Sequence, residues 1–260
     1  MISANAKKIQ KSFTGQAKNF ETESMNFTKA EYLKHMVTCV NPQRSHTVLE
    51  VAAGTCICGR CLAPIVKHVT CLDMTTAMLA VGKDKAKKQG LWNINFVQGD
   101  AEKLPFSDNR FDIVISRLAF HHFSNPKRCF SEMVRVLKTG GKLVIIDMQA
   151  AQKALRSTED EIQSLRDPSH IRNLSKQEFT EMFKENYLTI TTMDCTEIPV
   201  SLSSWLALTN TPKEISADIS NRLTNEIKGN GLTGFKPYEN NGQIYFIQRW
   251  IMMIGKKNNN

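Results

Sequence analysis

Acidic and small residues recur where short apolar runs of this 260-residue chain end. Glu50 lies near the end of one run and is followed by a turn containing Ala52 and Gly54, whereas Asp73 closes the next run. Small residues let backbone amides approach a ligand without an intervening side chain. A carboxylate at the end of a second strand can accept both hydroxyls of a ribose, as in dinucleotide-binding enzymes. The pattern therefore predicts a site for a nucleoside-bearing cofactor.

A nicotinamide dinucleotide is the first alternative, and the spacing of the turn argues against it. Its fingerprint places glycines at positions i, i+2 and i+5. Counted from Ala52, the chain has alanine, Gly54 and Ile57 at these positions. A third segment at 99–101, Gly-Asp-Ala, follows another apolar run and supplies a further acid.

The elements that must position these residues alternate between strands and helices. Apolar runs between turn residues predict strands at 47–51, 69–73, 94–100, 111–117 and 142–147. Helix signals predict helices over 55–66, from Thr75 or Thr76 to Gln89, and from Asn125 to the sequence KTGG at 138–141. We expect Pro64 to end or kink the first of these helices. Alternation of this kind predicts a parallel sheet whose ligands bind at the carboxyl ends of its strands.

The remaining sequence predicts additions to this core. Residues 1–40 predict two short helices that form a cap, and residues 41–260 the main domain, with its core at 45–150. Helices are predicted within 149–173, 175–186 and 203–229, strands at 187–198 and 243–255, and a disordered tail at 256–260. The predicted fold class is α/β: a Rossmann-like, doubly wound, mainly parallel seven-stranded sheet, with inserted covers at about 150–175 and 200–240.

Four segments carry a resemblance to a known family: TVLEVAAGTCICG (47–59), HVTCLDMTTAML (68–79), INFVQGDAEKLPFSDNRFDIVISRLAFHHF (94–123) and EMVRVLKTGGKLVIIDM (132–148). Together they resemble class I S-adenosylmethionine-dependent methyltransferases, within them the ubiquinone/menaquinone-type branch. The resemblance implies S-adenosylmethionine as cofactor, S-adenosylhomocysteine as product and a small-molecule acceptor. It implies cofactor-binding roles for Glu50, Ala52, Gly54, Cys56, Asp73, Met74, Gly99, Asp100, Ala101 and Arg117.

The family's first loop is acidic-x-Gly-x-Gly-x-Gly, which this chain matches only in part. Glu50 and Gly54 fit the pattern, Ala52 is a mild change, and Cys56 replaces the third glycine. This departure keeps open a second hypothesis, a protein that binds the cofactor without catalysing transfer.

Methyl transfer is an in-line displacement at an activated carbon, so alignment supplies much of the acceleration. In the resembled fold the loop SRLAFHHF points toward the transferable methyl group, which makes His121 and His122 candidates for a catalytic base or for orienting the acceptor. Packing beneath the cofactor is the alternative. Arg166 and His170, in RDPSH, and Arg172 are candidate substrate contacts, or parts of a turn that ties the insertion to the sheet.

Composition narrows the remaining possibilities. The formal net charge of +9 favours a polyanionic partner only if it gathers on one face, and the lysines are dispersed, so a nucleic-acid methyltransferase is the less favoured alternative. No apolar run reaches the roughly 20 residues of a membrane span. Cys56, Cys58 and Cys61 lack a second metal-binding pair, so we expect no metal. We expect a cytoplasmic monomer or homodimer with free thiols.

Overall fold

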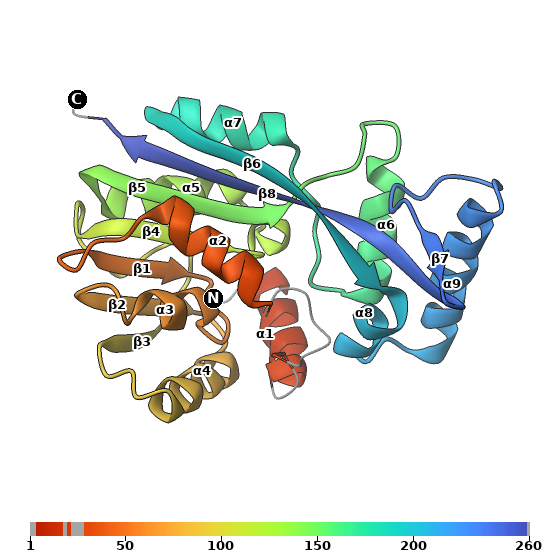
Figure 1. The fold of residues 1–260 in the computed structure, drawn as a ribbon, viewed down its shortest axis with the longest axis horizontal. Coiled ribbons are helices and arrows are strands. Elements are labelled where there is room, and N and C mark those ends of the chain that lie inside the picture. Colours follow the sequence, from red (N-terminus) through yellow and green to blue (C-terminus); the bar gives the residue numbers. More distant parts are fainter. Residues whose placement is uncertain (1–3, 18–19, 22–28, 259–260) are drawn as a thin grey trace.

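The computed structural model describes residues 4–17, 20–21 and 29–258. Its centre is one sheet in the order β3-β2-β1-β4-β5-β8-β6, with β7 paired to β8 (Figure 1). The first five strands of this order are parallel to one another, and β8 is antiparallel to both β5 and β6. The strands are β1 (Thr47–Val51), β2 (His68–Asp73), β3 (Ile94–Gln98), β4 (Phe111–Arg117), β5 (Leu137–Met148), β6 (Leu188–Ser201), β7 (Tyr238–Asn240) and β8 (Gln243–Lys257).

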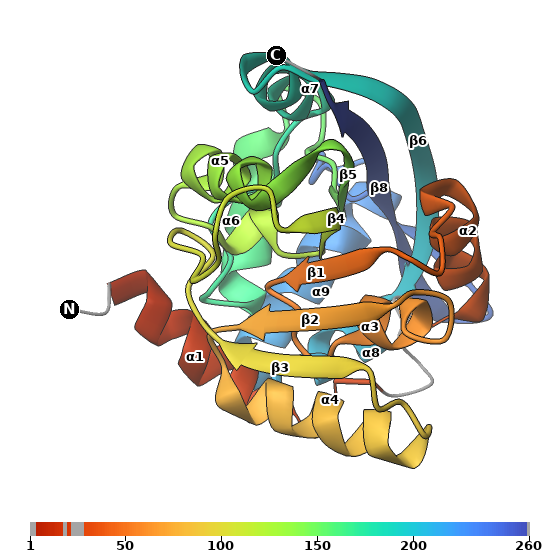
Figure 2. The same ribbon diagram turned by 90° about the vertical axis from the view of Figure 1, so that its left-hand side faces the viewer.

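Helices cover both faces of the sheet, as a doubly wound fold requires. One buried apolar cluster joins alternate residues of β1, β2 and β4 to α2 (Ala30–Val40), α3 (Ile57–Leu62) and α4 (Thr76–Lys88). The other joins the opposite faces of these strands to α5 (Pro126–Val136) and α7 (Lys176–Glu185). Figure 2 shows α5 and α3 on opposite sides of the sheet. The predicted α/β class with a mainly parallel sheet is confirmed.

The segment KTGG does not close a helix, contrary to the prediction. Helix α5 ends at Val136, and Lys138–Gly141 belongs to β5, where the register with β4 shifts between Phe111 and Ile113. Gly140 has a φ of +76°, and a Cβ on Gly141 would lie 2.9 Å from the Asp112 carbonyl oxygen. The glycines therefore serve a bulge between neighbouring strands rather than a helix terminus.

Two other predicted boundaries were also wrong. Helix α3 spans 57–62 rather than 55–66, because Cys56, with φ +62°, precedes it. Its end before Pro64 confirms the expected effect of that proline. Near the C-terminus, Lys256 and Lys257 continue β8 instead of starting a disordered tail. The Lys257 ammonium donates to the carbonyl oxygens of Val134 and Leu137, 2.8 Å from each, and so fixes the strand end; Asn259 and Asn260 lie outside the described residues.

An accessory lobe is built on β6 and β8, which run on together beyond the other strands (Figure 1). It contains α6 (Arg156–Arg166), α8 (Leu202–Leu208), α9 (Lys213–Ile227) and β7. Trp205, Phe235 and Phe246 form its aromatic core, with ring centroids 5.0 to 5.6 Å apart. The predicted capped helix at 175–186 is α7, whose Ser175 and Glu178 complete a capping box.

The predicted N-terminal helices are α1 (Ala4–Gln16) and α2. Helix α2 packs against α3, whereas α1 lies next to α4 at the carboxyl ends of the parallel strands (Figure 2). Within the described ranges, none of the helices combines the length and apolarity needed to span a bilayer.

Candidate active site

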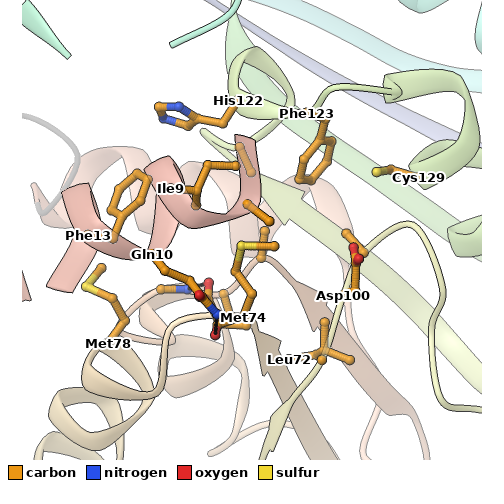
Figure 3. A pocket seen from close by; sticks show the side chains of 18 of the residues that line it. Ile9, Gln10, Phe13, Leu72, Met74, Met78, Asp100, His122, Phe123 and Cys129 are labelled. Atoms are coloured by element: carbon orange, nitrogen blue, oxygen red, sulfur yellow. Dashed lines mark hydrogen bonds between the residues drawn. The ribbon is translucent and has the colours of Figure 1, made fainter. Parts of the chain in front are cut away.

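A cavity of about 790 Å³ lies between α1 and the carboxyl ends of β1, β2 and β4. Figure 3 shows Ile9, Gln10 and Phe13 on one side of it and Leu72, Met74 and Asp100 on the other. The structure brings to its wall the predicted residues Glu50, Ala52, Gly54, Asp73, Met74, Gly99, Asp100, Ala101, Arg117 and His122. Cys56, His121, Arg166, His170 and Arg172 do not line it.

The turn after β1 has an unusual backbone. Ala52, Gly54 and Cys56 all lie in the left-handed region, with φ of 53°, 53° and 62°. Only glycine adopts this conformation without a steric cost, which gives a physical reason for glycine at the corresponding positions of the family. The Cys56 thiol lies 3.7 Å from the Gly54 carbonyl oxygen and packs toward α4 rather than lining the cavity.

Asp73 organises this turn as well as lining the cavity. Its carboxylate accepts hydrogen bonds from the amides of Gly54 and Thr75, both at 2.7 Å. Thr75 is the N-cap residue of α4; its own hydroxyl makes no capping bond, and its backbone amide is the group that Asp73 binds. Burial raises the pKa of Asp73, against the lowering effect of these amides. A carboxylate has about four acceptor positions, so capacity remains for ribose hydroxyls.

Glu50 lies beneath the turn, almost fully buried. Its two oxygens accept hydrogen bonds from the amides of Gly59 at 2.7 Å and Cys58 at 3.3 Å. Burial raises the pKa of Glu50 to about 7, although these amides favour the charged form. Glu50 therefore ties the end of β1 to the first turn of helix α3, and so supports the loop between them.

This raised pKa predicts a pH-dependent contribution to stability. Because the folded-state pKa lies above the usual 4.5, the folded chain holds the proton more tightly than the unfolded chain. The contribution is fully present below pH 4.5 and is lost as the pH rises through 7. We expect the free energy of unfolding of the wild type, relative to Glu50→Gln, to fall across this interval in urea titrations. A difference that stays constant or rises with pH would contradict the assignment.

The segment after β3 approaches the cavity closely. The Gly99 amide donates to the Asp73 carbonyl oxygen at 3.0 Å, and a Cβ on Gly99 would lie 2.7 Å from Leu72 Cδ1. Asp100 accepts from the Glu102 amide at 2.9 Å and is otherwise exposed. The Asp73 and Asp100 side chains thus belong to one cavity wall, as the sequence predicted from their places at the end of β2 and after β3.

Helix α1 provides the roof of the cavity, and its individual contacts were not predicted. Gln10 Nε2 donates to the Met74 carbonyl oxygen at 3.1 Å, and Asn5 Nδ2 to the His122 carbonyl oxygen at 3.1 Å. Phe13 meets the His122 ring edge to face, with centroids 5.1 Å apart. The helical spacing of Ile9 and Phe13 indicated an apolar face, and the sequence predicted residues 1–40 as a cap, but not which residues this helix contacts.

The two adjacent histidines differ in environment. His121 Nδ1 lies 2.6 Å from Asp147 Oδ1, and Asp147 Oδ2 accepts from the amides of Ala119 and Phe120. His121 therefore fixes the loop after β4. His122 lines the cavity; burial, together with His121, lowers its pKa to about 3, so its imidazole is neutral at physiological pH.

The predicted substrate contacts flank a turn at 168–169, as in the alternative interpretation, and each has a partner within the protein. Arg166 stacks on Trp205 and donates to its carbonyl oxygen at 3.0 Å. His170 Nε2 lies 3.0 Å from Asp160 Oδ1, and Arg172 pairs with Glu178 at 2.6 Å. These three side chains are absent from the cavity wall. Among the residues that the structure describes, no group of three His, Cys, Asp or Glu side chains could hold a metal ion.

This strand order, with a carboxylate at the end of β2 and another after β3 on one cavity wall, is the arrangement of class I S-adenosylmethionine-dependent methyltransferases. The family model "Methyltransferase domain" matches residues 49–145. The uncharacterized methyltransferase YcgJ of Bacillus subtilis is 31% identical over 247 residues, which cover 94% of this chain and 97% of YcgJ. The chain therefore belongs to this methyltransferase family.

Solved structures agree with this assignment. The crystal structure of YcgJ has a TM-score of 0.82 at 30% identity and covers 89% of this chain and 100% of its own. A putative methyltransferase from Bacillus halodurans has a TM-score of 0.81 at 30% identity, with 88% and 100% covered. The ubiquinone/menaquinone biosynthesis C-methyltransferase UbiE of Shewanella pealeana is 38% identical over 109 residues, 40% of this chain and 43% of UbiE.

Proposed function

We propose that this methyltransferase acts on a small, largely apolar acceptor bound between the cofactor and α1. The observation that carries the proposal is the roof that α1 places over the cavity. Small-molecule sites have volumes of roughly 300 to 1,000 Å³, and the 790 Å³ cavity lies within this range. Ile9 and Phe13 from α1, and Phe123 after β4, supply apolar walls that the cofactor residues do not (Figure 3).

The charges on the wall support an acceptor without phosphate groups. Glu50, Asp73, Asp100 and Glu102 are acidic, and Arg117 is the only lysine or arginine on the described part of the wall. Arg117 also lies over the Trp250 ring, 5.2 Å from its centroid. A phosphate-rich acceptor would meet net negative charge here, whereas a sulfonium cation would be attracted.

The chain's own residues divide the work of binding and alignment. Bound S-adenosylmethionine supplies a methyl group made electrophilic by its sulfonium centre. We assign Asp73 to the ribose, Asp100 and the neighbouring amides to the adenine, and the turn at 52–56 to the amino-acid part. Helix α1 excludes water and holds the acceptor against the methyl group, which is the principal catalytic contribution expected of such a site.

Incubation with methyl-labelled S-adenosylmethionine and a metabolite extract tests this proposal. We expect label in a small organic-soluble product, at a rate that depends little on salt. Label in nucleic acid, with an affinity that falls steeply as salt rises, would instead favour the nucleic-acid alternative. Cofactor binding without label in any acceptor would favour the binding protein that Cys56 suggested.

We assign His122 to contact with the acceptor, so a change of this histidine should affect turnover rather than cofactor binding. His122→Gln should lower turnover by about 100-fold, the lower end of the range for proton-transfer groups, with the Kd for S-adenosylmethionine nearly unchanged. His170→Gln is the matched control, because the buried His170 ring packs near the His122 ring, with centroids 6.4 Å apart, but does not line the cavity. Equal turnover of His122→Gln and wild type would remove His122 from the mechanism.

A further inference from the structure

A chain of hydrogen bonds connects His122 to a buried carboxylate. His122 Nδ1 lies 3.0 Å from the Ser169 carbonyl oxygen and 3.2 Å from Ser169 Oγ. Ser169 Oγ in turn donates to Asp167 Oδ1 at 2.6 Å. A carbonyl oxygen can only accept, and the Ser169 hydroxyl proton is committed to Asp167. Both contacts therefore require the proton of the neutral imidazole to be on Nδ1.

Asp167 is almost fully buried and has no lysine or arginine bonded to its carboxylate in the described structure. Its Oδ1 also accepts from the Ser169 amide at 2.9 Å and from the Ser12 hydroxyl of α1 at 3.0 Å. Burial opposes its charge, but His122 in its protonated form at low pH, the bonds from Ser169 and the neighbouring Arg166 guanidinium together lower the pKa of Asp167 to about 2. One buried anion thus contacts both the roof helix and the residue that holds His122.

The other ring nitrogen, Nε2 of His122, has no hydrogen-bond partner among the described residues, and the residue lines the cavity. We propose that Asp167 and Ser169 are positioning residues: they hold His122 protonated on Nδ1, so that its Nε2 lone pair accepts the proton of a hydroxyl or amine on the methyl acceptor. This inference rests on the proposed function. It restricts the acceptor to molecules that carry such a proton at the methylated atom.

The methyl-transfer step conserves charge within the site. The acceptor oxygen or nitrogen forms a bond to the methyl carbon, the carbon–sulfur bond breaks with its electron pair going to sulfur, and the acceptor proton passes to Nε2. One positive charge therefore leaves the sulfur as another arrives on the imidazole. Burial and the neighbouring His121 disfavour an imidazolium at this position, and the nearby Asp167 carboxylate, bridged through Ser169, offsets part of that cost.

A double-mutant cycle separates positioning from general structural support. Asp167→Asn keeps the side-chain size and removes the charge; we expect turnover to fall about tenfold or more, with the Kd for S-adenosylmethionine retained. In a His122→Gln background the same change should cost nothing further. Asp160→Asn, which alters the carboxylate beside His170, is the matched control and should not lower turnover. A tenfold loss that persists in the His122→Gln background would overturn the positioning role.

The state of His122 can be measured without an acceptor. In nitrogen-15 NMR spectra of histidine-labelled protein, assigned by comparison with His122→Gln, we expect His122 to be a neutral ring protonated on Nδ1 at pH 7, with and without S-adenosylhomocysteine. A ring protonated on Nε2, or an imidazolium, would overturn the inference even if methyl transfer is found. The expected tautomer together with no methyl transfer to any acceptor would refute the proposed function, and with it the proton-transfer step, while leaving the hydrogen-bond chain established.

Discussion

Asp73→Asn is expected to weaken S-adenosylmethionine binding by about 10- to 100-fold. Each charge-assisted hydrogen bond contributes roughly 1.5 to 3 kcal/mol, and about 1.4 kcal/mol corresponds to tenfold in Kd. An asparagine amide group would also face the amides of Gly54 or Thr75, both of which are donors. The variant therefore disturbs the turn that holds the amino-acid part as well as the proposed ribose contact. Isothermal titration calorimetry with S-adenosylmethionine and with S-adenosylhomocysteine measures the loss of affinity for each ligand.

Asp84→Asn is the matched control for this experiment. Asp84 lies on α4, exposed and paired with Lys88 at 2.7 Å, and does not line the cavity. We expect its Kd to equal that of the wild type. Unchanged affinity in Asp73→Asn would refute the assignment of Asp73 to the cofactor.

Gly82→Ala should destabilise the protein and weaken cofactor binding together. Gly82 lies within α4, where a Cβ would lie 2.7 Å from the Thr55 carbonyl oxygen and 2.9 Å from its carbon. Alanine normally stabilises a helix by about 1 kcal/mol relative to glycine. Here the added methyl meets backbone of the cofactor turn, and overpacking of this kind costs roughly 1 to 3 kcal/mol. Urea unfolding and calorimetric titration measure the two effects.

Gly15→Ala provides a control of the same chemistry in another helix. Gly15 is in α1, and a Cβ there would meet no atom within 4 Å. We expect this variant to be as stable as the wild type or slightly more stable. Equal stability and cofactor affinity in Gly82→Ala and Gly15→Ala would show that the close packing of α4 on the cofactor turn is not needed for the cofactor site.

Much of the cofactor half was predictable because its signals are local. Each strand from β1 to β5 is a short apolar run between turn residues, and carboxyl ends of parallel strands share one edge. The sequence therefore predicted that Glu50, Asp73 and Asp100 lie at one edge of the sheet, and all three line the cavity. The left-handed conformations of Ala52 and Cys56 were harder to predict, because these residue types ordinarily avoid them.

The rest depends on contacts between distant parts of the chain. Gly82 is an ordinary helix residue in sequence, and only the approach of Thr55 gives it a role. Asp167 and Ser169 were recognisable as part of a turn, but Ser169 and His122, which it contacts, are 47 residues apart in the sequence. The pair of glycines after α5 resembled a helix stop, and the bulge they form depends on the register with β4.

Calorimetric titration of the wild-type chain with S-adenosylhomocysteine tests the central claim most directly. The cavity beneath α1 predicts saturable binding of one molecule per chain, with competition between this product and S-adenosylmethionine for the same site. Titrations that show no binding of either compound would contradict the assignment of the cavity to the cofactor.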